Sequence, residues 1–401
     1  MNILYLCDEY PPGRHGGIGT SVQLLARQMV KLGHKVVVAG LYGPGYGGDD
    51  EFVDKGVRVY RFRRGYDFDF LADEATLTSR ITMRFLRDSG LLQRDIIKSL
   101  AVYQNKLEDI IKEHGIEIIE MPDYNDYIRF CKSFVPFPQL SVPVVVKMNG
   151  TITYFKNEAN QSVPQHILKM EQAILNQAAA VSSASKYTAD QSALYLSYNK
   201  HITVLYNGID TNIPAANIIK KSKQVIFTGT LVEKKGIYQL AKAWNIVIKA
   251  IPDARLLVLG KGPQQKVTGY LNVDAQPSVI FKGHVATNEL YSLLQESAIS
   301  IFPSYAEAFA LAPLEAMACG TAVINSNRTS GPELLEDEIS GLLIDPDNTE
   351  QIASSIIYLL NNPDVCAGLA RKGNKTVKER FEIGKIASEN IEFYKGILAK
   401  R

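Results

Sequence analysis

Residues 303–320 read PSYAEAFALAPLEAMACG and follow the apolar run Ile299–Phe302. The apolar run has the length and composition of a buried β-strand. Pro313 is tolerated in the first turn of a helix and Gly320 is a usual residue after the last turn, so we expect a helix from Leu311 to Gly320. The stretch therefore predicts a strand, a loop and a helix, which is the repeating unit of parallel α/β sheets.

This loop and the helix after it carry two carboxylates, Glu307 and Glu315. Carboxylate oxygens accept hydrogen bonds from hydroxyls, so the two residues suit a polyol ligand. The backbone amides of Phe309, Ala310 and Leu311 would face the carboxyl edge of the sheet, where open α/β sheets bind ligands. A glutamate early in a helix also complements the helix dipole without any ligand, and for Glu315 alone this structural role is favoured.

The order of strand, loop and helix recurs at the start of the chain and again in its middle. Ile3–Leu6 precedes a glycine-rich loop and a helical pattern over Ser21–Lys31, and Gln224–Thr228 precedes a loop and a helix over Ile237–Ala250. Further strands are expected at Val36–Ala39, Val57–Phe62, Ile116–Met121, Pro143–Met148, Ala179–Ser182, Ile202–Leu205, Arg255–Leu259, Val279–Phe281, Ala322–Asn325 and Leu342–Ile344. Such runs are buried on both faces, so we predict two doubly wound α/β domains joined around Tyr206–Ser222.

Size and composition agree with two globular domains. The chain has 401 residues, of which 46% are hydrophobic and 21% charged, and its net charge is +2. This balance gives no indication of a nucleic-acid-binding surface. The four cysteines, which lack the spacing of metal ligands or paired redox thiols, are expected to be reduced in a cytosolic protein. The start of the chain lacks the pattern of a signal peptide, and no apolar run approaches the ~20 residues of a spanning helix.

Two further loops, residues 13–20 and 227–236, can bring backbone amides close to a ligand, because each precedes the N-terminus of a helix. In the second loop, Lys235 lies just before the helix, where a cation and the helix N-terminus can share a diphosphate. A solvated pair of lysines is the more common outcome of such a sequence. The first loop lacks the G-x-G-x-x-G order, so it does not indicate a dinucleotide site.

The order of these segments resembles glycosyltransferase family 4, retaining enzymes of the GT-B fold, over nearly the whole chain. Glu307–Gly320 matches the E-x7-E pattern of the family, and Gly229–Gly236 resembles its G-R-x-x-x-x-K-G loop. Further matches are Pro11-Pro12, Gly16-Gly17, Asn207–Asp210, Leu259–Pro263, Phe281–Gly283, Ser330–Glu333 and Gly341–Leu343. The resemblance implies two Rossmann-like domains facing across a cleft: an acceptor-side domain over residues 1–204 and a donor domain over residues 205–382. It also implies a C-terminal helix, residues 383–401, that packs back on the first domain.

The resemblance implies roles for single residues. Glu307 would hold hydroxyls of the donor sugar, Glu315 would bind the ribose, and Lys235 would neutralise the diphosphate leaving group. Catalysis is therefore expected to rest on Lys235 and Glu307. The residues implied to contact the donor are Gly16, Gly17, Gly229, Lys235, Gly260, Gly283, Glu307, Phe309, Ala310, Leu311 and Glu315.

Three positions depart from the family pattern. Thr230 stands where the family usually has an arginine on the diphosphate, Asn149 stands where many members have a histidine near the reacting carbon, and Ala310 replaces a common glycine. Asn149, Gly150 and His15 are candidates for contact with the acceptor or the reacting centre. Three cations could replace the charge missing at Thr230, and the sequence does not choose among them: Arg14, Lys147 and Lys234.

The resemblance implies transfer of a sugar from a nucleoside-diphosphate sugar, with a uridine diphosphate donor as the family default, to a hydroxyl of a glycan or lipid-linked acceptor. Bacterial surface polysaccharide synthesis is the expected setting, in the cytoplasm or at the inner face of the membrane. No cofactor, metal or nucleic-acid partner is expected. If the acceptor is lipid-linked, the basic helical pattern over Leu77–Leu100 is the first place to expect peripheral membrane contact. A solvated helix is favoured there, because Asp88 and Asp95 interrupt its positive face.

Other classes of function have weaker support. A non-catalytic sugar-nucleotide-binding protein of the same fold is the main alternative, because Thr230 and Asn149 replace a charged and a titratable residue. A metal-dependent transferase would need a D-x-D pair at the end of a buried strand, and neither Asp67-Phe68-Asp69 nor Asp345-Pro346-Asp347 is expected there. An NAD-dependent enzyme lacks its fingerprint, and the acids and bases of a non-hydrolysing epimerase cannot be placed.

Overall fold

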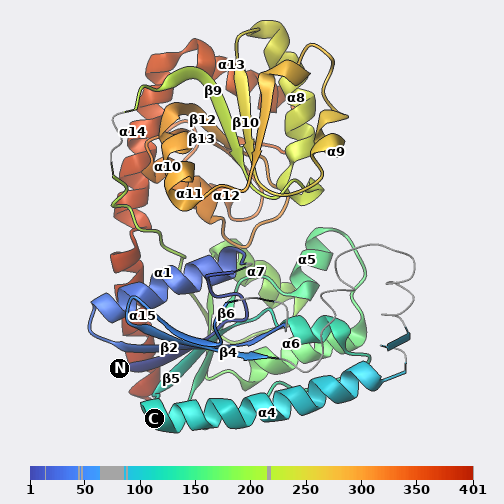
Figure 1. Cartoon of the computed structure of the whole chain (residues 1–401), viewed down its shortest axis with the longest axis vertical. Helices are drawn as coiled ribbons and strands as arrows, with labels where there is room; N and C mark the ends of the chain where they lie inside the picture. Colours follow the sequence, from blue (N-terminus) through green and yellow to red (C-terminus); the bar gives the residue numbers. More distant parts are fainter. Residues whose placement is uncertain are drawn as a thin grey trace. The chain divides into compact units, whose positions relative to one another are not determined.

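The structure is a computed structural model that describes residues 1–13, 15–43, 46, 48–63, 85–86, 89–214 and 218–400. The chain divides into two compact units, which Figure 1 shows coloured along the sequence. Unit 1 comprises Met1–Gly208 and Ile386–Arg401, and unit 2 comprises Ile209–Lys385. Each unit has its own sheet, and we describe each by itself.

Unit 1 is built on an eight-stranded sheet in the order β3-β4-β2-β1-β5-β6-β7-β8. Its strands are β1 (Asn2–Leu6), β2 (Lys35–Tyr42), β3 (Glu51–Asp54), β4 (Val57–Arg63), β5 (Ile118–Pro122), β6 (Val144–Met148), β7 (Ala180–Ser183) and β8 (Ile202–Val204). Neighbouring strands pair in parallel, except that the edge strand β3 runs antiparallel to β4. The sequence did not reveal β3, because its four residues are exposed or half-buried and form no apolar run.

Helices cover both faces of this sheet. They are α1 (Gly17–Lys31), α4 (Leu91–His114), α5 (Ile152–Glu158), α6 (Gln165–Gln177), α7 (Lys186–Tyr195) and α15 (Ile383–Leu398), with the 3-10 turn η2 (Asp126–Phe130). Apolar residues of α4 and α6 share one core with the sheet, and α1 lies on the opposite face (Figure 1). The Tyr394 hydroxyl of α15 donates a hydrogen bond of 2.6 Å to the Glu120 carboxylate of β5, both buried. This contact ties the end of the chain to the middle of the sheet.

The helix predicted over Leu77–Leu100 differs from the structure. Helix α4 runs from Leu91 to His114, well past the predicted end, because apolar residues continue at core-facing positions as far as Ile111. Residues 64–84 and 87–88 lie outside the described residues, and so do Arg14 and the Asp67-Phe68-Asp69 segment. Within the described part of the chain, no helix has both the length and the apolar content needed to cross a membrane.

Unit 2 is built on a six-stranded parallel sheet in the order β11-β10-β9-β12-β13-β14. The strands are β9 (Lys221–Thr228), β10 (Arg255–Leu259), β11 (Val279–Gly283), β12 (Ser297–Phe302), β13 (Ala322–Ser326) and β14 (Leu342–Ile344). The predicted α/β class, with two largely parallel sheets flanked by helices, is confirmed.

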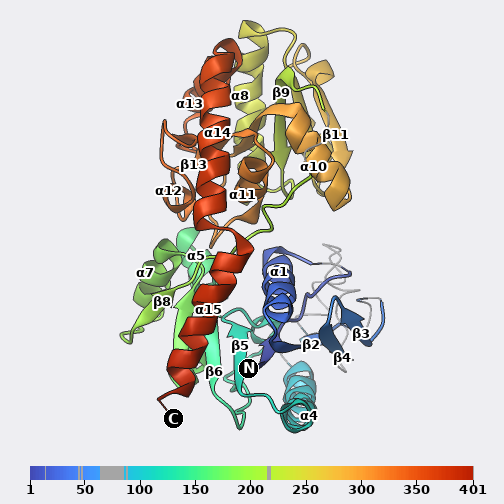
Figure 2. The ribbon, with the colours of Figure 1, turned by 90° about the vertical axis from the view of Figure 1, so that its left-hand side faces the viewer.

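The helices of unit 2 follow its strands in the expected alternation. They are α8 (Ile237–Ala250), α9 (Gln264–Thr268), α10 (Thr287–Glu296), α11 (Leu311–Ala318), α12 (Gly331–Leu334), α13 (Thr349–Asn361) and α14 (Pro363–Arg380), with the 3-10 turns η3 (Glu233–Lys235) and η4 (Gln276–Ser278). Helices α8 and α13 pack against each other on one face of the sheet, and α10 and α11 lie on the other face (Figure 2). Because β9, β12 and β13 are parallel, the loops that follow them meet at one edge of the sheet.

Candidate active site

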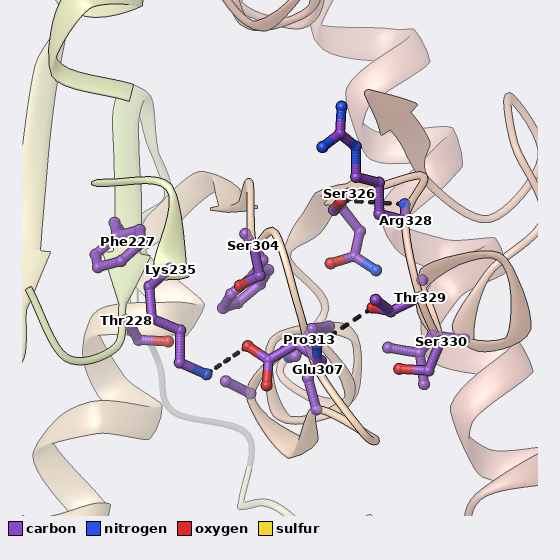
Figure 3. Close-up of a pocket in the computed structure, with 16 residues that line it drawn as sticks. Phe227, Thr228, Lys235, Ser304, Glu307, Pro313, Ser326, Arg328, Thr329 and Ser330 are labelled. Atoms are coloured by element: carbon purple, nitrogen blue, oxygen red, sulfur yellow. Dashed lines mark hydrogen bonds and ion pairs between the residues drawn. The ribbon is translucent and has the colours of Figure 1, made fainter. Parts of the chain in front are cut away.

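A cavity of unit 2 lies where the loops after β9, β12 and β13 meet (Figure 3). Its walls are rich in hydroxyl, amide and charged groups. The polar lining residues are Thr228, Lys235, Ser304, Glu307, Asn325, Ser326, Arg328, Thr329 and Ser330. The carboxyl edge of a parallel sheet is where such folds bind their ligands, and we therefore treat this cavity as the candidate active site.

An ion pair between Lys235 and Glu307 stands at the centre of the cavity, with the Lys235 ammonium donating a hydrogen bond to the carboxylate of Glu307 (Figure 3). Lys235 ends the turn η3, directly before helix α8. A Cβ at the next residue, Gly236, would lie 1.8 Å from the carbonyl oxygen of Pro303, so only glycine lets the lysine loop approach the Glu307 loop. The Tyr305 N–H also donates to the Lys234 carbonyl at 2.8 Å, which joins the two loops.

The charge state of Glu307 follows from this contact. Its side chain is only 18% exposed. Burial alone would raise the pKa of the carboxyl group, but the positive charges of Lys235 and Lys234 outweigh burial and hold the pKa below its usual range. Glu307 is therefore ionised at neutral pH. An ion pair of this kind can exchange partners, with the ammonium binding a phosphate while the carboxylate accepts hydrogen bonds from hydroxyls.

Helix α11 begins at Leu311, as predicted, and ends at Ala318, before Gly320. Its N-cap residue is Ala310, and no side chain in the described part of the chain caps this helix terminus. Ala310 lines the cavity, so the N-terminus of α11 opens toward it. The first-turn amides and the helix dipole favour negative charge at this place.

Glu315 lies one turn into α11 and does not line the cavity that contains Glu307. Burial raises the pKa of its carboxyl group to about 7. Among the described residues, no cation contacts this carboxylate. The cost of ionising it in a buried place is therefore not offset. The Tyr291 phenol of α10 is close enough that the Glu315 charge contributes, after burial, to raising the pKa of Tyr291. The two carboxylates of the E-x7-E segment thus lie in different environments.

Three glycines predicted to contact the donor lie side by side, although they belong to the carboxyl ends of three different strands. The Gly229 N–H donates to the Leu259 carbonyl at 2.9 Å, and the Gly260 N–H donates to the Gly283 carbonyl at 2.7 Å. A Cβ at Gly260 would lie 1.9 Å from the carbonyl oxygen of Gly229, so a side chain there would separate the two loops. The structure brings Gly229, Gly260 and Gly283 together, outside the cavity of Lys235 and Glu307.

Thr230, which stands where the family usually has an arginine, carries no charge. Thr230 is exposed and does not line the cavity. Lys234 does not line the cavity either, although its positive charge contributes to the lowered pKa of Glu307. Arg328 lines the cavity, but its guanidinium points away from the Lys235–Glu307 pair (Figure 3). It donates to Asp345 at 2.7 Å and to Asp347 at 2.6 Å. The D-P-D segment is therefore engaged by an arginine, and among the described residues no group of three or more His, Cys, Asp or Glu side chains gathers as metal ligands would.

The loop between β13 and α12, residues 327–330, was missed as part of the site. Arg328, Thr329 and Ser330 line the cavity, and the Thr329 hydroxyl accepts a hydrogen bond of 3.3 Å from the Glu307 N–H. A signal was present in the sequence, because Ala322–Asn325 was predicted as the strand that follows Ile299–Phe302 along the chain, and parallel strands end at one edge of a sheet. The segment Ser330–Glu333 was matched to the family without being given a role.

In unit 1, the glycine-rich loop before α1 is organised around Glu9, which sequence reasoning did not single out. The Gly19 N–H donates to the Glu9 carboxylate at 2.7 Å. Burial raises the pKa of Glu9, and hydrogen bonds from the N–H groups of Gly19, Gly16 and Ile18 partly offset this effect. The amide of Gly17 is not among these donors. Glu9 thus satisfies most of the N–H groups that a helix N-terminus leaves without partners.

The candidates for the reacting centre also lie in unit 1. The backbone N–H groups of Asn149 and Gly150 donate to the two oxygens of Asp123 at 2.8 and 3.3 Å. Asp123 is 1% exposed, and burial raises the pKa of its carboxyl group to about 7. The Asn149 side chain donates to the carbonyl of Lys147, whose own side chain is buried. His15 is exposed, and its ring nitrogen lies 2.7 Å from the Gly13 carbonyl.

The two α/β units together have the GT-B fold, which solved glycosyltransferases also have. The sucrose-phosphate synthase of Thermosynechococcus elongatus has this fold, with a TM-score of 0.75 and 18% identity over all of both chains. The Anabaena protein HepE, solved with UDP and glucose, has a TM-score of 0.65 and 16% identity over 99% of this chain and 100% of that one. The expected GT-B fold is confirmed.

Sequence comparison identifies the family. The model described as Glycosyltransferase Family 4 matches residues 15–213, and the model described as Glycosyl transferases group 1 matches residues 209–376. The glycogen synthase of Mycobacterium tuberculosis is 24% identical over 417 aligned positions, which cover 100% of this chain and 95% of that protein. The chain belongs to glycosyltransferase family 4.

Proposed function

We propose that the protein is a retaining glycosyltransferase that moves a sugar from a nucleoside-diphosphate sugar to a hydroxyl of a glycan or lipid-linked acceptor. The Lys235–Glu307 pair at the carboxyl edge of the unit 2 sheet carries this proposal. It offers a cation for a diphosphate and an ionised carboxylate for sugar hydroxyls. The helix N-termini of α8 and α11, which begin beside these two residues, supply further amides for negative charge.

In the proposed reaction, the bond between the anomeric carbon and the diphosphate oxygen breaks while positive charge develops on the sugar ring. The acceptor hydroxyl forms the new bond from the same face, and a phosphate oxygen of the leaving group takes its proton. No side chain has to act as a base, which agrees with an asparagine at position 149. Lys235 stabilises the negative charge on the leaving diphosphate, and such electrostatic stabilisation is usually the largest contribution to catalysis.

For the donor we propose a uridine diphosphate sugar. HepE, which shares the fold, was solved with UDP and glucose, and this supports a uridine nucleotide here. Glu315, carried by the helix that begins beside Glu307, is the proposed ligand of the ribose hydroxyls. We propose bacterial surface polysaccharide synthesis as the setting, in the cytoplasm or at the inner face of the membrane, and reaction without a metal ion.

The proposal is tested by measuring release of free nucleoside diphosphate from a panel of sugar nucleotides, with glycan and lipid-linked acceptor fractions assayed separately. We expect one donor to turn over with one acceptor fraction, to give a product of retained anomeric configuration, and to do so equally well with a chelator present. Loss of turnover on chelation would contradict a metal-independent reaction. Inversion of the anomeric centre would contradict the mechanism.

A second function, sugar-nucleotide binding without catalysis, is favoured by one observation. Among the described lining residues, Lys235 is the one cation directed at the centre of the cavity, since the Arg328 guanidinium is bound to Asp345 and Asp347. Tight binding of a sugar nucleotide by the wild-type protein, with no turnover in any acceptor fraction, would establish this second function.

A further inference from the structure

Thr329 has an unusual backbone for its residue type. Its φ is +53°, in the left-handed region that β-branched residues rarely adopt. Four other residues of the described chain that are not glycine have positive φ, and all four are exposed: Lys55, Asn160, Ser197 and Glu338. Thr329 is only 8% exposed. Backbone strain of this kind persists where the surrounding structure enforces it, and it concentrates at functional sites.

The unusual backbone directs the Thr329 side chain into the active-site cavity. Figure 3 shows the hydroxyl beside Glu307, whose N–H donates to it at 3.3 Å. The neighbouring Ser330 hydroxyl is buried on the same wall, without a hydrogen-bond partner among the described residues. A buried hydroxyl without a partner is a common sign that a ligand or a water completes the site.

The Glu307 loop is held from two sides. On one side, the Tyr305 N–H donates to the Lys234 carbonyl at 2.8 Å, and the Lys235 ammonium binds the Glu307 carboxylate. On the other side, the loop is held by the contact of the Glu307 N–H with Thr329. The backbone of Glu307 is therefore fixed between the loop after β9 and the loop after β13. Removing the threonine hydroxyl would remove this contact while leaving the ion pair in place.

We propose that Thr329 is a positioning residue, which sets the backbone of Glu307 and so directs its carboxylate toward the hydroxyls of the donor sugar. This inference rests on the proposed function of Glu307. Because Glu315 lies outside this cavity, the effect of Thr329 is confined to the sugar part of the donor and does not extend to the nucleotide. Displacement of a catalytic group lowers the reaction rate strongly, since about 1 Å of misplacement can lower a rate by roughly a hundredfold.

Three substitutions separate the hydroxyl from the backbone strain. Thr329→Val keeps the shape and the strain but removes the hydroxyl, Thr329→Ser keeps the hydroxyl, and Thr329→Gly removes both the hydroxyl and the strain. Glu338→Gly is the matched control, because Glu338 is exposed, has a φ of 59°, and lies away from the cavity in the same unit. Binding of UDP and of the UDP-sugar, thermal stability, kcat and KM are measured on the full-length chain.

In T329V and T329G, we expect affinity for the UDP-sugar and kcat/KM to fall roughly tenfold or more, with affinity for UDP changed less than about twofold. T329S should stay within about threefold of wild type, because the hydroxyl acceptor is kept. The thermal midpoint of T329G should equal or exceed that of wild type despite its lower activity, because glycine adopts this backbone without strain. E338G should match wild type in activity.

The inference is overturned if T329V and T329G bind and turn over the UDP-sugar as wild type does, or if activity follows thermal stability across the variants. If T329V does not fold, the inference is tested by comparing T329S with T329G in affinity for the UDP-sugar and in kcat/KM. Equal values for these two variants overturn it. A wild-type protein that binds no sugar nucleotide overturns the proposed function together with the inference. Wild-type binding with unchanged variants overturns the inference alone.

Discussion

Glu307 and Glu315 lie in neighbouring parts of one strand–loop–helix segment, yet the structure gives them opposite acid–base properties. Glu307, in the loop, contacts Lys235 and has a lowered pKa, because the positive charges near it outweigh burial. Glu315, in helix α11, has a pKa raised to about 7 by burial. Glu307 is therefore a permanent carboxylate at neutral pH, whereas Glu315 titrates close to neutrality.

The comparison shows that a spacing motif identifies residue types but not their charge state. The lowered pKa of Glu307 comes from a lysine 72 residues earlier in the chain, at the end of η3. Glu315 has no such partner in the described structure, so burial dominates its titration. We infer that the two residues respond differently to substitution and to pH, and the predictions below separate them.

The largest effect is expected for Lys235→Ala, which removes the cation that pairs with Glu307. We expect kcat to fall by at least two to three orders of magnitude, as in other enzymes that lose a group stabilising charge in the transition state. The pKa of Glu307 should rise at the same time, because burial then acts without the main opposing charge. Steady-state kinetics with the identified donor measure the first effect.

Lys223→Ala is the matched control for this variant. Lys223 is an exposed lysine of unit 2 that pairs with Asp253 at 2.6 Å, away from the cavity. It should change activity less than about twofold and leave the thermal midpoint close to that of wild type, because surface ion pairs contribute little to stability. Near-native turnover in the Lys235 variant would rule out the role proposed for this lysine.

A smaller loss is expected for Glu307→Gln, which keeps the shape but removes the charge. Charge-assisted hydrogen bonds contribute roughly 1.5–3 kcal/mol each, so kcat/KM should fall about 10- to 100-fold. Affinity for UDP alone should change little, since the proposed contacts of Glu307 are to the sugar. Calorimetry with UDP and with the UDP-sugar distinguishes these contributions, and an equal loss for both ligands would contradict the assignment of Glu307 to the sugar.

For Glu315→Gln, the expected change is in pH dependence. The folded protein holds the proton of Glu315 up to about pH 7, above the ordinary range of the unfolded chain. The free energy of unfolding should therefore fall as pH rises from about 4.5 to 7, since ionisation is easier in the unfolded state. The glutamine variant should lack this slope and be roughly 1–3 kcal/mol more stable than wild type at pH 8.

Donor binding provides a second measurement on Glu315. If ribose hydroxyls donate to the carboxylate, binding favours its ionised form, so wild-type affinity for UDP should increase as pH rises through 7. The Glu315→Gln variant should bind UDP more weakly above pH 7, with little change in affinity between pH 6 and 8. A wild-type affinity that is independent of pH in this range would argue against contact between Glu315 and the nucleotide.

The smallest effect is expected for Asp345→Asn, which weakens one of the two ion pairs of Arg328. The partners are 38% and 41% exposed, so the loss in stability should stay below about 1 kcal/mol. Activity should remain within about threefold of wild type, because the Arg328 guanidinium points away from Glu307. A large loss of activity in this variant would show that Arg328 contributes to the site and would reopen the question of what replaces the arginine absent at Thr230.

Sequence reasoning located the strands and helices where apolar runs are long and bounded by glycine or proline. The strand Ile299–Phe302 and the start of α11 at Leu311 were predicted in this way. It missed the edge strand β3, which has no apolar run, and it ended α4 at Leu100, although the helix continues to His114. Edge strands need little burial, and a charged helix keeps its structure through one apolar face alone.

The candidate site was predictable only in part, for a different reason. Lys235 and Glu307 were recognised from their loops, but Glu9, Asp123 and Thr329 were not. Each of these three accepts hydrogen bonds from backbone N–H groups of another segment: Glu9 from the start of α1, Asp123 from the turn after β6, and Thr329 from the Glu307 loop. The partner of such a contact is an amide that every residue except proline possesses, so the sequence carries no pattern for it.

The sequence by itself determined the α/β class, the alternation of strands and helices, and the presence of Lys235 and Glu307 in loops and Glu315 in the following helix. These properties follow from local burial, helix termini and turn residues, which depend on residues close together in the sequence. Tertiary structure alone decided that Lys235 pairs with Glu307, that Glu315 is left to titrate near pH 7, and that Thr329 adopts a strained backbone beside them. Charge state and strain depend on distances between segments far apart in the chain, and only packing of the sheet brings those segments together.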